Sequence, residues 1–139
     1  MARKRRKNNK NKNRRDRDQH TQDKPQRRRR KLMYEIDLHG LTWDQAERRL
    51  RAAPREAGFF GSRLIKIIHG WGRETGSNVL QTKVRSWLAR NPFSFRAAIP
   101  GETYSLTNRQ TVKMRDEIGQ FPDNDLNARN AGMTIVWIR

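Results

Sequence analysis

Apolar residues begin abruptly at Leu32 and then recur in short, regular groups. Residues 32–38 end in alternating apolar and polar positions, which is typical of a half-buried strand. The nearly continuous aliphatic run at 64–68 is rich in β-branched residues and predicts a central strand that is buried on both faces. Two further strands are predicted at 93–99 and 133–138.

A first helix is predicted to begin at Trp43. Thr42 and Gln45 have the spacing of a capping box, in which each side chain bonds the backbone N–H of the other residue. Pro54 lacks a backbone N–H and costs a helix interior about 3 kcal/mol, so we expect the helix to break or kink near Ala53.

Two more helices follow. Asn78 is predicted to cap the second, with Gln81 reciprocating, and a weaker third helix is predicted over 108–119 with Val112 and Ile118 as its apolar anchors. The second helix has a clear apolar face, made of Leu80, Val84, Trp87 and Leu88. The resulting order, β-α-β-α-β-(α)-β, predicts an α/β fold of the two-layer sandwich type.

The charge of the chain is concentrated at one end. Residues 1–31 hold 16 of the 32 Lys and Arg but only 3 of the 14 Asp and Glu, and 3–31 contain no aliphatic or aromatic side chain. Such a segment cannot bury enough apolar surface to order itself. We therefore expect residues 1–31 to be a disordered basic tail and 32–139 to be one α/β domain. The tail suits a polyanion, which predicts nucleic acid as the partner.

Other classes are disfavoured by what the sequence lacks. There is no cysteine, so disulfides and thiolate metal sites are excluded. No run of about 20 apolar residues and no apolar signal-peptide core follow the basic start, so we expect no membrane partner and a cytoplasmic location.

Two similar segments carry the candidate chemistry. Asp37 and His39 end the first predicted strand, and His69 ends the second, each followed by glycine. Strands joined by a crossover helix are usually parallel, so their carboxyl ends lie on one edge of the sheet, where ligands bind in open α/β sheets. The two imidazoles are therefore expected to share one cleft.

The loop after His69 has the features of a phosphate site. Glycines let backbone N–H groups approach a ligand, and the amino end of the following helix attracts anions. A histidine beside a bound phosphate can act as general acid or base. The predicted phosphate or nucleic-acid contacts are Gly70, Trp71, Gly72, Arg73, Gly76 and Arg85.

These residues resemble the Smr (small MutS-related) domain. The resemblance rests on 37–42 (DLHGLT), on 67–72 (IIHGWG) and on the Gly76 and helical pattern that follow, and it covers roughly 33–139. It implies a fold like the carboxyl-terminal domain of a bacterial translation initiation factor. Some members of this family nick DNA, and others cleave messenger RNA on stalled or collided ribosomes. The motif-matched residues are Asp37, His39, His69, Gly70 and Gly72.

The leading hypothesis is a metal-independent endonuclease, a hydrolase without a cofactor. His39 and His69 would divide the general acid and base roles, and Asp37 would orient His39. In the variant hypothesis Asp37 binds a divalent metal, although the ligand count does not support one. The acidic segment 123–127 lacks the glycine and glutamate of a calcium loop and is better explained by turn chemistry.

Two other functions are weighed against catalysis. The first is a non-catalytic RNA- or ribosome-binding module that uses the same cleft to hold phosphate. The second is an adaptor that recruits a partner through the long 101–132 loop. The sequence does not choose between RNA and DNA.

Overall fold

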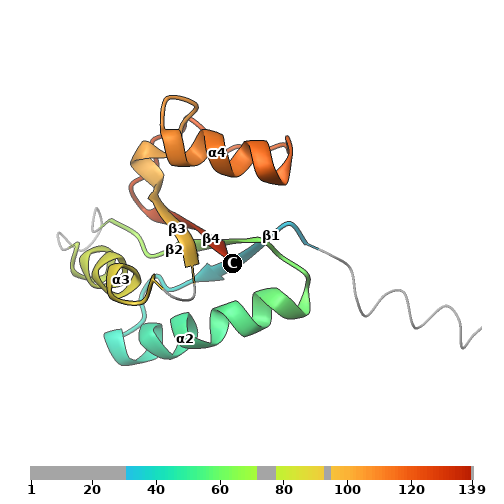
Figure 1. The fold of residues 1–139 in the computed structure, drawn as a ribbon. Coiled ribbons are helices and arrows are strands. Elements are labelled where there is room, and N and C mark those ends of the chain that lie inside the picture. Colours follow the sequence, from blue (N-terminus) through green and yellow to red (C-terminus); the bar gives the residue numbers. More distant parts are fainter. Residues whose placement is uncertain (1–30, 72–77, 93–94, 139) are drawn as a thin grey trace, which may run out of the picture. The chain divides into compact units, whose positions relative to one another are not determined.

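The computed structural model describes residues 31–71, 78–92 and 95–138. Within this part of the chain, four strands form one mixed sheet in the order β1-β2-β4-β3 (Figure 1). The strands are β1 (Met33–Asp37), β2 (Leu64–Ile68), β3 (Phe95–Pro100) and β4 (Met133–Ile138). The predicted parallel pairing of β1 with β2 is confirmed, whereas β4 runs antiparallel to both of its neighbours.

Helices cover both faces of this sheet. Figure 1 shows α2 (Trp43–Phe59) and α3 (Val79–Arg90) on one face and α4 (Arg109–Ile118) on the other, following the short 3-10 helix η2 (Gly101–Thr103). The predicted α/β class and element order are confirmed. The two predicted layers correspond to the sheet with α2 and α3, and α4 adds a cover on the second face. The implied likeness to a translation initiation factor stays a prediction.

Two separate apolar clusters hold these layers together. The first packs Leu50 of α2 and Val84 of α3 against Ile65 of β2. The second packs Met114 of α4 against Ile135 of β4. Burial on both faces explains why β2 and β4 are apolar at every position except Lys66 and Thr134.

The α2 helix differs from its prediction at Pro54. The capping box is present as expected, because Thr42 accepts from the backbone N–H of Gln45 and the Gln45 side chain accepts in return. The predicted break near Ala53 is wrong, since the helix continues through Pro54 to Phe59. The buried Ala53 belongs to the first apolar cluster, and packing of this kind offsets the local cost of proline.

The third helix, α4, buries a different face from the one that the sequence predicted. Asn108 caps α4 by accepting from the backbone N–H of Thr111 at 2.9 Å. Val112, a predicted anchor, is 37% exposed, while Thr111, Met114 and Arg115 are buried. The prediction for Val112 is therefore wrong.

The loop after α4 is tied back to the sheet. Lys66 of β2 forms an ion pair with Asp125 at 2.6 Å. Asp123 accepts from the backbone N–H of Asp125 at 3.0 Å, which is the turn chemistry expected for this acidic segment. None of the described helices is long and apolar enough to span a membrane.

Candidate functional site

The carboxyl ends of β1 and β2 form one rim of the sheet. Asp37 lies opposite Ile68 in the parallel register, and the backbone N–H of Leu38 donates to the carbonyl of Ile68 at 2.7 Å. The segments that follow carry His39 and His69. The structure thus brings the two histidine segments, 30 residues apart in sequence, side by side at one edge.

Asp37 and His39 both have exposed side chains at this rim. The Asp37 Oδ1 atom accepts from the backbone N–H of His39 at 2.9 Å, so the carboxylate fixes the turn after β1. Asp37 was expected to orient the imidazole of His39, but the observed hydrogen bond orients the backbone of His39 instead. The turn then directs the His39 ring toward the second histidine segment.

Gly70 lies beside the His39 ring. A Cβ atom at residue 70 would lie 3.5 Å from Cδ2 of His39, and Gly70 has a φ of +73°. Glycine is therefore favoured for its backbone conformation, since a Cβ atom at this distance would only touch the imidazole.

His69, in contrast, is buried, with 3% of its surface exposed. Its Nδ1 lies 2.6 Å from the carbonyl oxygen of Gly70, and its Nε2 lies 2.9 Å from Oγ1 of Thr134. Because a carbonyl only accepts, we assign the proton to Nδ1 and leave Nε2 to accept from the Thr134 hydroxyl. Both ring nitrogens are engaged inside the protein, and burial lowers the pKa of His69, so the ring is neutral at pH 7.

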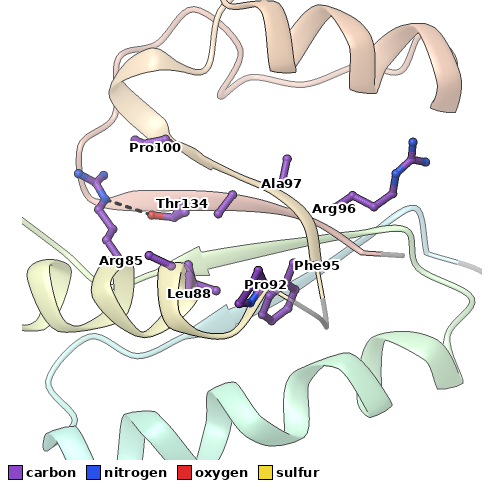
Figure 2. Close-up of a pocket in the computed structure, with 10 residues that line it drawn as sticks. Arg85, Leu88, Pro92, Phe95, Arg96, Ala97, Pro100 and Thr134 are labelled. Carbon is purple, nitrogen blue, oxygen red and sulfur yellow. Dashed lines mark hydrogen bonds between the residues drawn. The ribbon is translucent and has the colours of Figure 1, made fainter.

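A chain of polar groups extends from His69 across the sheet. Figure 2 shows the bond from Nε of Arg85 on α3 to Thr134, at 3.4 Å. The other nitrogens of Arg85 form a bidentate pair with Glu102 of η2, at 3.0 and 2.7 Å. Arg85 was predicted to contact phosphate; in the structure its guanidinium is held by Glu102, and this ion pair is only partly buried.

Sequence reasoning missed Thr134 and Glu102. Thr134 gave one signal, because it is the only polar residue in the strand 133–138. A buried polar side chain needs a hydrogen-bond partner, and that requirement points toward a polar site. Glu102 follows the strand β3 and gave no comparable signal.

The remaining predicted contacts are only partly described. Trp71 is 50% exposed and its Cδ1 lies 3.4 Å from where a Cβ on Gly132 would be, so the indole lies beside the start of β4. Gly72, Arg73 and Gly76 fall in 72–77, outside the described residues. The predicted phosphate contacts of that loop therefore stay predictions.

The start of α3 also differs from expectation. Asn78 is the residue before the helix, but its side chain makes no capping bond. Gln81 donates instead to the carbonyl of Ala131 at 2.7 Å, so the predicted reciprocal cap is wrong. Among the described residues, no three histidine or acidic side chains converge as metal ligands would.

We expect the buried His69 to make the fold sensitive to acid. Its folded pKa lies below the unfolded value of about 6.5. Below that pH the unfolded chain binds a proton that the folded protein resists, so the free energy of unfolding should fall as pH falls, by at most about 1.4 kcal/mol per pH unit. Urea titrations across this range should show a shallower pH dependence for His69→Gln. Parallel curves for the two proteins would contradict the assignment.

Comparison with known proteins shows which family and which solved structure are similar to this chain. Residues 36–103 match the model of the Smr domain family. The crystal structure of the Smr domain of Thermus thermophilus MutS2 is similar to this chain, with 23% sequence identity and a TM-score of 0.47, over 76% of this chain and 98% of that one. No curated protein matches the chain.

Proposed function

We propose that this protein is an endonuclease that cleaves RNA at the rim carrying His39. The proposal is supported by the match of residues 36–103 to the Smr domain family, a nucleic-acid-binding or nuclease-type module. The observation that carries the proposal is the exposed His39 imidazole beside Gly70, at the carboxyl ends of two parallel strands. Ligands bind at this edge in open α/β sheets. The basic segment 1–31 supplies sequence-independent affinity.

The proposed step is an attack by the 2′-hydroxyl of the RNA on the adjacent phosphorus. The imidazole of His39 accepts the proton of that hydroxyl, the new oxygen–phosphorus bond forms, and the bond from phosphorus to the 5′-oxygen breaks. A water molecule supplies the proton that the departing 5′-oxygen takes up. The products are a 2′,3′-cyclic phosphate and a 5′-hydroxyl end.

The two histidines have different tasks in this proposal. His39 contacts the substrate, whereas His69 is a positioning residue, because its Nδ1 holds the carbonyl of Gly70 and its Nε2 is bound by Thr134. Asp37 fixes the turn that presents His39. This division replaces the symmetric acid–base pair that the sequence suggested.

Analysis of product ends tests the proposal. The full chain should convert labelled RNA to fragments with cyclic phosphate ends, in the presence of a chelator, and should leave DNA of the same sequence intact because DNA has no 2′-hydroxyl. Products with 5′-phosphate ends, or complete inhibition by the chelator, would contradict this mechanism and favour the metal-assisted variant. Cytoplasmic RNA, including RNA on ribosomes, is the setting that the family resemblance suggests.

A non-catalytic binding module is the second candidate. It is favoured by the partners of His69 and Arg85, since the first is enclosed in the fold and the second is paired with Glu102. A rim with a single exposed imidazole can hold a phosphate without cleaving it. Identical background cleavage by wild type and His39→Ala would establish this alternative.

A further inference from the structure

A pocket of 310 Å³ lies between α3 and β3 (Figure 2). Its walls are mostly apolar, and one end is polar, where Arg85 and Thr134 meet. The apolar walls include Leu88 and Ala89 of α3 and Phe95 and Ala98 of β3. The volume is at the lower limit of small-molecule sites, which span about 300–1,000 Å³.

The polar end of the pocket lies at the same rim as His39. Thr134 pairs with Ile67 of β2 and with Pro100 of β3, so it stands where β2 and β3 end. Its hydroxyl is hydrogen bonded to His69 at 2.9 Å. Neighbouring strands are about 4.8 Å apart, and β4 is two strands from β1 in the sheet. Roughly 10 Å therefore separate Thr134 on β4 from the end of β1, which leads to His39.

We propose that this pocket binds one unpaired nucleobase of the nucleic acid whose backbone passes His39. The inference rests on the proposed function and adds that the substrate is single-stranded at that position. A base inside a duplex is stacked and paired, so it cannot enter a pocket of this kind. The apolar walls suit the faces of a flat ring, and the partly exposed guanidinium of Arg85 suits its polar edge.

Charge favours a nucleotide over an apolar protein side chain as the occupant. Arg85 and Arg96 stand at the two ends of the pocket. Each is paired with a glutamate, but both ion pairs are partly exposed, and pairs of that kind are weak. A phosphodiester can therefore replace either glutamate at small cost, whereas an apolar peptide gains nothing from these groups.

Binding measurements with two matched oligomers test the inference. Oligothymidine carries bases, and an abasic deoxyribose-phosphate oligomer of the same length carries the same charge; neither has the 2′-hydroxyl that the proposed cleavage needs. The full-length wild type should bind oligothymidine about tenfold more tightly than the abasic oligomer. Ala89→Phe fills the pocket from an exposed helical position and should bind both at the abasic level. Ala52→Phe, the same change at an exposed position of α2, should keep the wild-type difference.

Two results would overturn base binding in the pocket, and a third would refute the proposed function. Equal binding of both oligomers by the wild type overturns the inference and leaves RNA cleavage at His39 standing. A base preference that survives in Ala89→Phe also overturns it, because the base must then bind elsewhere, for example on Trp71. Failure of the wild type to bind any single-stranded or double-stranded nucleic acid refutes the proposed function itself.

Discussion

The His39→Ala variant is expected to cleave RNA about 10²–10⁴-fold more slowly than the wild type, which is the usual contribution of one general acid–base group. His39 is the exposed imidazole at the rim, its ring lies beside Gly70, and it is the histidine that contacts the substrate in the proposed function. The free energy of unfolding should change by less than about 0.5 kcal/mol, because the side chain is on the surface. Single-turnover cleavage and urea denaturation measure the two quantities.

Two other histidine variants serve as controls. His20→Ala changes the histidine of the basic N-terminal segment and should cleave at the wild-type rate. His69→Ala removes the partner of Thr134 and of the Gly70 carbonyl, so it should lose about 1–3 kcal/mol of stability. If His39→Ala lost as much stability as His69→Ala while cleaving normally, His39 would be a structural residue.

The sequence placed both histidine motifs correctly relative to the sheet, because crossover connections constrain the strands on either side to be parallel. It could not show which ring faces inward. That depends on Thr134, which lies 65 residues beyond His69 and reaches it only through the antiparallel pairing of β4 with β2. The residues around each histidine do not reveal such a distant contact, so the two histidines looked equivalent in the sequence.

In the fold, too, features set by neighbouring residues were predictable, whereas features set by tertiary packing were not. The Thr42 cap was predictable because the capping bonds join residues three apart. Pro54 and Val112 were misjudged because local rules state the cost of a proline, or the apolar character of a valine, without the packing that competes with them. In α4 that packing turns Met114 inward and leaves Val112 largely at the surface.

The Arg115→Met variant is expected to lower the free energy of unfolding by about 3–5 kcal/mol, the cost of removing one partner from a buried ion pair. Arg115 and Asp123 each expose only 5% of their side chains. The guanidinium donates to the Tyr104 hydroxyl at 3.3 Å and to the carbonyl of Phe121 at 2.9 Å, and the Tyr104 hydroxyl donates to Asp123. Without Arg115 the carboxylate stays buried with too few donors.

Urea denaturation of three variants separates charge pairing from packing. Arg51→Met breaks an exposed pair with Glu47 on α2 and should cost no more than about 0.5 kcal/mol. Adding Asp123→Asn to Arg115→Met removes the unpaired charge, so it should restore part of the lost stability. If the double variant is instead as unstable as the sum of the two single changes, packing against Phe121 holds the loop, and the buried charge contributes little.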